Sequence, residues 1–262
     1  DRCLEAGITI IDSAEMYPVN PVRPETCGRS EEIIGQWNAA NPSRRGAYQL
    51  ATKISGYNER FMRPGEPISA RTFRAAFEGS LKRCQTDHID IYQLHWPNRG
   101  SYHFRQNWSY DPSTQDKAQT LDHMAEVLEE AGKLVREGKL RHFALSNEST
   151  WGTAQWLRLS EDRNLPRVQT VQNEYSLLCR AYDTDMAEMA VNERVTHLAF
   201  SPLACGMLTG KYQGGEVPEG SRRSLVPELG GRWSDRVGPA IDAYLGIAET
   251  HGLDPVAMSL AW

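Results

Sequence analysis

Short apolar runs alternate with amphipathic helical stretches along the whole chain, and this alternation constrains the fold more than any other feature. The alternation is typical of βα units built around a parallel sheet. We expect strands at 8–12, 48–53, 89–95, 141–146, 168–173 and 197–201. We expect helices at 30–40, 70–85, 120–137, 151–160, 184–194, 235–250 and 255–262. No linker divides the chain, so residues 1–262 are predicted to form a single α/β domain.

Local signals mark several element ends. Ser30 and Ser69 are predicted to cap helices at their N-termini, and Gly138 is predicted to end one. Two long stretches, 97–119 and 213–232, lack periodicity and follow predicted strands. Loops after the strands of a barrel build its active-site face, so both stretches are candidate lids rather than disordered insertions.

Charge and composition exclude several classes of function. The net charge is −5, and the 29 basic and 34 acidic residues are interspersed. The sequence therefore shows no basic patch of the kind that binds nucleic acid. No apolar run approaches the roughly 18 residues that a membrane-spanning helix needs. The five cysteines are scattered, which is typical of a reduced intracellular protein, so we expect a cytoplasmic location. The seven histidines form no metal-binding motif, so no metal site is predicted.

Four polar residues, Asp12, Tyr17, Lys53 and His95, lie at or just beyond the ends of the first three predicted strands. Each has an ordinary explanation when taken alone, such as a helix cap, a surface tyrosine, a solvated strand end or a loop histidine. Together, a carboxylate, a phenol, an ammonium and an imidazole at successive strand ends predict a catalytic face that can exchange a proton with a carbonyl oxygen.

The segments around these residues resemble the aldo-keto reductase superfamily, and within it the bacterial Tas-like reductases and the potassium-channel β subunits. The resemblance covers nearly the whole chain. In order, it rests on GITIIDSAEMY (7–17), LATK (50–53), DIYQLHWP (90–97), LSN (145–147), VQNEY (171–175) and FSPL with GMLTGKY (200–203 and 206–212). The family implies a (β/α)8 TIM barrel, of which this sequence supplies six strands and would lack the first and the last.

Carbonyl reduction needs a proton for the developing alkoxide, and we assign that proton to Tyr17 as general acid. A tyrosine has an unperturbed pKa of about 10. Lys53 is predicted to lower the pKa of the phenol, and Asp12 to hold the lysine charged and in position. His95 is predicted to donate a hydrogen bond to the carbonyl oxygen and orient it.

The later motifs resemble the family's contacts to NADPH, which is the predicted cofactor. Ser146, Asn147 and Gln172 carry groups that suit a nicotinamide carboxamide. Phe200 would stack on the nicotinamide ring, where many family members have a tyrosine. The residues expected to wrap the pyrophosphate are Ser201, Leu203, Gly206, Leu208, Gly210 and Lys211, although a simple glycine-rich turn would explain them equally well.

The predicted function is therefore the NADPH-dependent reduction of aldehydes or ketones, with Trp96 in the substrate pocket and a small carbonyl compound as the partner. Two alternatives are a regulatory subunit that binds NADPH and turns over slowly, and a barrel that serves only as a scaffold. By resemblance, the segment that would recognise the 2′-phosphate follows the last strand and lies outside this sequence. Because the sequence begins within an expected helix, we expect the natural chain to be longer by roughly 60–90 residues.

Overall fold

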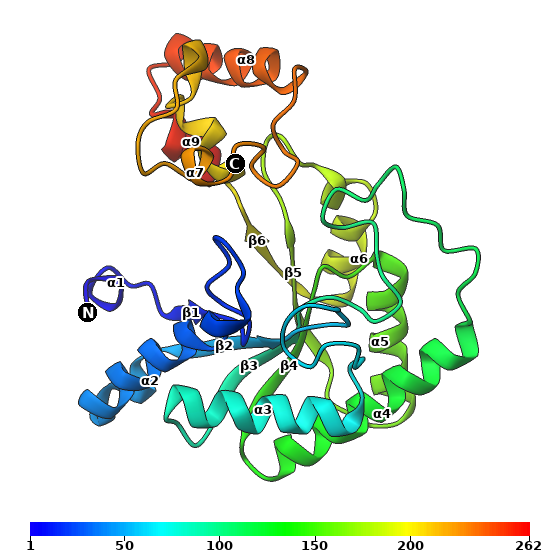
Figure 1. Cartoon of the computed structure of the whole chain (residues 1–262). Helices are drawn as coiled ribbons and strands as arrows, with labels where there is room; N and C mark the ends of the chain where they lie inside the picture. The colour runs from blue at the N-terminus through cyan, green and yellow to red at the C-terminus, as the bar shows by residue number, and fades with distance from the viewer.

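The computed structural model describes residues 1–262 and contains one sheet of six parallel strands. The strands pair in the order of the sequence, β1-β2-β3-β4-β5-β6, and the sheet curls into a partial barrel of the (β/α)8 type (Figure 1). The strands are β1 Ile10–Asp12, β2 Gln49–Ile54, β3 Ile89–Leu94, β4 Leu140–Ser146, β5 Val168–Glu174 and β6 Thr196–Phe200. This arrangement confirms the predicted fold class and the predicted strands.

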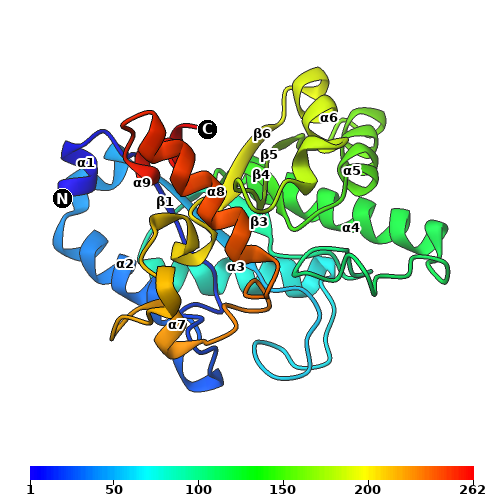
Figure 2. The same cartoon turned by 90° about the horizontal axis from the view of Figure 1, so that it is seen from above.

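Helices α2 to α6 cover the outer face of the sheet, and the last helices lie over the carboxyl ends of the strands (Figures 1 and 2). The α-helices are α1 Arg2–Glu5, α2 Arg29–Ala40, α3 Ala70–Cys84, α4 Lys117–Arg136, α5 Thr150–Asp162, α6 Met186–Glu193, α7 Arg222–Leu225, α8 Val237–Thr250 and α9 Pro255–Ala261. The 3-10 turns are η1 Pro24–Thr26, η2 Pro42–Ala47, η3 Ala181–Asp183, η4 Ala204–Thr209 and η5 Gln213–Gly215. None of the helices is both long and apolar enough to cross a membrane.

Capping explains where several helices begin and end. Ser69 forms a capping box with Thr72 at the start of α3, as predicted. Gly138 follows α4 with a left-handed φ of +73°, which also agrees with the prediction. The prediction for Ser30 was wrong, because Gly28 takes the cap position of α2 with a φ of +86° and Ser30 lies in the first turn. Helix α4 starts three residues earlier than expected because the side chain of Asp116 caps it.

The main core lies between the sheet and the helices that cover its outer face. Phe73 and Phe77 of α3 pack edge-on against Tyr92 of β3, with ring centroids 5.2 and 4.9 Å apart. Helix α2 approaches α3 closely at Gly35, where an added Cβ would lie 2.0 Å from the carbonyl oxygen of Arg83. This packing holds β1 to β3, which carry the predicted catalytic residues, against a rigid outer layer.

A second, smaller cluster lies apart from the main core, in the segment after β6. Its buried members include Met207, Leu208, Tyr212 and Ile241. The segment Ser201–Trp262, whose last helices are orange and red in Figure 1, thus packs around a separate hydrophobic cluster that also includes Leu177.

Candidate active site

Lys53 and Asp12 form an ion pair at the carboxyl ends of β1 and β2. The Lys53 ammonium donates hydrogen bonds to Asp12 Oδ2 at 2.5 Å and to the carbonyl oxygen of Ser13 at 2.7 Å. The side chain of Lys53 is 0% exposed, whereas that of Asp12 is 32% exposed. The Lys53 ammonium is therefore buried and held by Asp12 and Ser13, whereas the Asp12 carboxylate remains partly exposed to solvent.

Tyr17 and His95 lie beside this ion pair. The ring of Tyr17 is 5.6 Å from the ring of His95 in an edge-on arrangement, and the Lys53 ammonium lies 5.3 Å from the centre of the Tyr17 ring. The carbonyl oxygen of Tyr17 accepts a hydrogen bond from the backbone N–H of Ser30 at 3.3 Å, so the first turn of α2 anchors the tyrosine loop. The structure thus brings the four predicted catalytic residues together, although their roles stay predictions.

The protonation behaviour of Tyr17 differs from the expectation. Burial and then the Asp12 carboxylate raise the pKa of Tyr17 to about 12, and the Arg222 guanidinium opposes this shift. The pKa is thus shifted upward, whereas the pairing with Lys53 predicted a downward shift. Burial lowers the pKa of Lys53 itself, and Asp12 opposes that change.

His95 is held neutral by its surroundings. Burial, together with the nearby Lys53 ammonium, keeps the pKa of His95 well below its ordinary value. Its Nδ1 atom is buried without a hydrogen-bond partner. A neutral imidazole can donate a hydrogen bond without bringing a second positive charge beside Lys53.

Two residues near the site were not found from the sequence. Gln93 donates a hydrogen bond to Asp12 Oδ1 at 2.9 Å, and it lies opposite Lys53 in the register of β2 and β3. Its spacing of two residues before His95 on one strand is the signal that could have pointed to it. Arg222, the first residue of α7, opposes the rise in the pKa of Tyr17 through its positive charge. The two residues are far apart in the sequence, so no local pattern indicates this effect.

The residues predicted to hold the nicotinamide form a buried hydrogen-bonded group at the ends of β4 and β5. The hydroxyl of Ser146 donates to the carbonyl oxygen of Gln172 at 2.8 Å. The amide nitrogen of Asn147 donates to the carbonyl oxygen of His95 at 3.0 Å, which joins this group to the predicted catalytic residues. Asn147 Oδ1 is buried and has no partner, so one acceptor remains available for the amide of a carboxamide.

The predicted pyrophosphate residues lie in a tight loop after β6. Ser201 and Gly206 have left-handed backbones, with φ of +54° and +94°. A Cβ at Gly206 would lie 2.8 Å from the Lys211 ammonium, so a larger residue there would push the lysine side chain aside. Leu208 is fully buried in the C-terminal cluster, which leaves only its main chain for a ligand. The loop is small and carries a cation, which fits a phosphate group.

The remaining predicted residues border this loop and the His95 strand. Phe200 is the last residue of β6 and is half-buried, with its strand at one edge of the sheet. Leu203 and Gly210 flank η4, which they enclose. Trp96 lies 5.0 Å from the His95 ring, and its indole N–H donates to the carbonyl oxygen of Tyr57 at 3.1 Å. Trp96 is therefore placed beside the proposed carbonyl position.

The first of the two candidate lids is fastened to the end of β4. The Ser101 hydroxyl donates to the carbonyl oxygen of Asn147 at 3.0 Å, and His103 Nε2 lies 3.0 Å from the carbonyl oxygen of Glu148. Arg99 pairs with the buried Glu148 carboxylate. Residues 99–103 are thus held against the end of β4, next to the residues predicted to bind nicotinamide. This position agrees with a loop that shapes the site.

Comparison with known proteins identifies the class. The sequence profile described as "Aldo/keto reductase family" matches residues 1–262, and the chain belongs to this family. It is therefore an oxidoreductase of the aldo-keto reductase type.

Individual relatives support this assignment. The chain is 40% identical to "Protein tas" of Escherichia coli (strain K12) over 268 residues, which cover 100% of this chain and 75% of that protein. It is 32% identical to "Uncharacterized oxidoreductase YrpG" of Bacillus subtilis (strain 168), covering 80% of this chain and 58% of that protein. It is 27% identical to "Aflatoxin B1 aldehyde reductase member 2" of Rattus norvegicus, covering 83% of this chain and 51% of that protein.

Proposed function

We propose that this protein reduces aldehydes or ketones to alcohols with NADPH as the hydride donor. The observation that carries the proposal is the assembly of Tyr17, His95 and the Lys53–Asp12 pair at one edge of the sheet, joined through Asn147 to a buried acceptor suited to a carboxamide. The name of the rat relative, an aldehyde reductase, supports the choice of carbonyl substrate.

The residues of this chain would act on the substrate oxygen. The neutral imidazole of His95 would donate a hydrogen bond to the carbonyl and hold it beside the Tyr17 hydroxyl. With a pKa of about 12, Tyr17 keeps its proton at neutral pH and can give it to the alkoxide that forms, since an alkoxide is more basic than a phenolate. A bound nicotinamide would supply the hydride. Solvent would then return the proton to Tyr17.

We infer a role for Lys53 that differs from the one expected. The ammonium lies near the phenol ring but is bonded to Asp12 and Ser13, so it would stabilise the phenolate left after proton transfer rather than deprotonate Tyr17 beforehand. Gln93 would keep Asp12 in place for that task.

The cofactor proposal has its own support in the structure. Asn147 offers an unused buried acceptor, and Lys211 packs over the glycine loop that would wrap the pyrophosphate. These features fit a nicotinamide dinucleotide bound across β4 to β6.

The decisive experiment is to mix the purified protein with NADPH and a panel of aldehydes and follow the absorbance of the reduced nicotinamide. We expect substrate-dependent oxidation of NADPH with a turnover typical of enzymes, about 1–10³ per second. Tight NADPH binding with turnover slower than about one per minute would instead favour a regulatory subunit, and no binding would favour a scaffold.

A further inference from the structure

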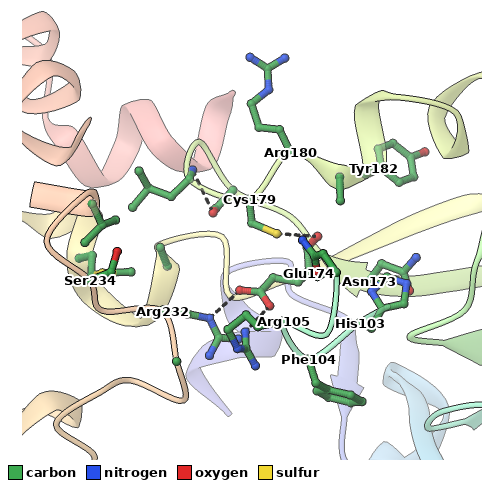
Figure 3. A pocket seen from close by; sticks show the side chains of 18 of the residues that line it. His103, Phe104, Arg105, Asn173, Glu174, Cys179, Arg180, Tyr182, Arg232 and Ser234 are labelled. Carbon is green, nitrogen blue, oxygen red and sulfur yellow. Dashed lines mark hydrogen bonds and ion pairs between the residues drawn. The ribbon is translucent and has the colours of Figure 1, made fainter. Parts of the chain in front are cut away.

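A cavity of about 480 Å³ lies between the 97–116 loop, the segment after β5 and the residues around the start of α8. Figure 3 shows its centre, where Glu174 lies between Arg105 and Arg232. None of the residues predicted for catalysis or cofactor binding lines it. The cavity is large enough for a small organic ligand.

The centre of the cavity carries a positive charge. Arg105 Nη1 donates to Glu174 Oε2 at 2.8 Å, and Arg232 Nε donates to Glu174 Oε1 at 2.5 Å. The side chains of Glu174 and Arg232 are each 11% exposed. Two guanidinium groups on one carboxylate leave a net charge of +1 in a protein whose net charge is −5.

Several guanidinium donors at the cavity are not used by the protein. Arg105 bonds to Glu174 through Nη1 alone, and Arg232 uses Nε for Glu174 and Nη1 for the carbonyl oxygen of Leu229. The ion pairs around the cavity also leave Arg236 without a carboxylate. Since guanidinium forks bind carboxylates in pairs of hydrogen bonds, these free donors suit a second carboxylate.

The fourth arginine of the lining is already engaged. Arg180 pairs with Asp183 at 2.5 Å and lies 4.8 Å above the ring of Trp262. Its guanidinium points away from Glu174 in Figure 3, so it does not contribute to the positive charge at the centre of the cavity.

Aromatic contacts connect the cavity to the catalytic residues. Phe104 lines the cavity and lies 6.0 Å, edge-on, from the ring of Trp96. Trp96 in turn lies 5.0 Å from His95, which contacts Tyr17. Phe104 therefore gives the cavity an aromatic wall next to Arg105.

We propose that this cavity binds a small organic carboxylate. This binding does not depend on the proposed function. Glu174 positions the two arginines, and Arg236 contributes a third guanidinium to the lining.

Binding can be tested without catalysis. We expect benzoate to bind to the purified protein in a calorimetric titration and its neutral analogue benzamide to bind at least about tenfold more weakly, because a charge-assisted pair is roughly twice as strong as a neutral hydrogen bond. Arg236→Gln and Arg105→Gln should each weaken benzoate binding about fivefold or more. Arg158→Gln, which removes an exposed arginine of α5, is the matched control and should leave the affinity unchanged. Equal binding of benzoate and benzamide, or no effect of either cavity variant, would overturn the proposal.

Two competitors decide what the site recognises. If inorganic phosphate displaces benzoate at equal concentration, the site is a general anion site and the carboxylate proposal is wrong. If NADPH displaces benzoate, the cavity belongs to the dinucleotide and the proposal is also wrong. We expect neither to compete.

Discussion

The residues predicted to be catalytic and the segment after β6 are built in different ways. Lys53 lies within a paired strand and His95 directly follows one, and the main core behind them contains 26 buried residues. The segment Ser201–Trp262 is built from turns and short helices around a cluster of only 7 buried residues. Its loop includes Ser201 and Cys205 in left-handed conformations that cost free energy in non-glycine residues.

The difference separates the two tasks of the proposed enzyme. Groups that transfer a proton need fixed positions, and parallel strand pairing supplies them. A loop that wraps a ligand needs local freedom, and a small cluster with few buried apolar contacts permits it. Glu174 is one charged link between the two regions, because it ends β5 and binds Arg232 of the later segment. A substitution in one region should therefore leave the other largely unchanged unless the two are coupled.

The largest effect is expected for Tyr17→Phe in the strand-end region. Loss of the phenol proton should lower kcat by about 10²–10⁴-fold, the usual contribution of general acid catalysis. The dissociation constant for NADPH should stay within about twofold, because the later segment is untouched. Steady-state kinetics and fluorescence titration measure the two quantities. Tyr175→Phe, outside the catalytic group, is the control, and a kcat above a third of the wild-type value would remove Tyr17 from its role.

Lys53→Met should separate rate from stability. We expect kcat to fall at least about tenfold, since the phenolate loses its ammonium neighbour. The free energy of unfolding should change by less than about 2 kcal/mol. Methionine fills the space of the lysine side chain, and no buried ammonium then has to be desolvated. Asp12 keeps its hydrogen bond from Gln93 and remains partly exposed to solvent. Urea denaturation and kinetics test this pair of expectations. A large loss of stability with unchanged kcat would make Lys53 a structural residue.

Glu174→Gln should loosen the connection between the two regions. The charge that holds Arg105 and Arg232 is removed, so we expect NADPH affinity to fall a few-fold, with a smaller change in kcat. Hydrogen exchange should rise in residues 222–237 but not in β1 to β3. The control is Glu193→Gln, which removes an exposed partner of Arg167. Uniform acceleration of exchange would show that the regions form one cooperative unit.

The smallest effect is expected from pH. The raised pKa of Tyr17 keeps its proton bound well above neutrality, and the lowered pKa of His95 keeps the imidazole neutral well below its ordinary range. Neither group then changes charge between about pH 6.5 and 9, so kcat for reduction should stay level there. A rate that falls between pH 7 and 9 would mean that Tyr17 loses its proton in that window.

The raised pKa of Tyr17 also makes the stability of the fold depend on pH. Because the folded state raises the pKa of Tyr17 from 10.0 to about 12, the proton on Tyr17 stabilises the fold fully below pH 10. That contribution is lost as the pH rises through 12. Tyr17→Phe should therefore flatten the alkaline part of the stability curve.

The sequence was sufficient for the strands and for the positions of the catalytic residues, because both depend on local patterns. Asp12, Lys53 and His95 each end an apolar run, and parallel pairing then brings such ends to one edge. The pKa of Tyr17 could not be predicted, since burial depends on the packed neighbours. Glu174 was missed for a related reason: its partner Arg105 lies 69 residues away in the sequence.

The strictly sequential pairing of the strands has a consequence for how the chain folds. Each strand pairs only with the strands next to it in sequence, so every sheet contact closes a loop of a single βα unit. Short loops cost little entropy to close and favour rapid folding. We expect assembly to spread from neighbour to neighbour, so that Asp12, Lys53 and His95 come together as soon as β1 to β3 have docked. The proton-transfer group would then be in place before Phe200 and the loop beyond it, and synthesis from the N-terminus would follow the same order.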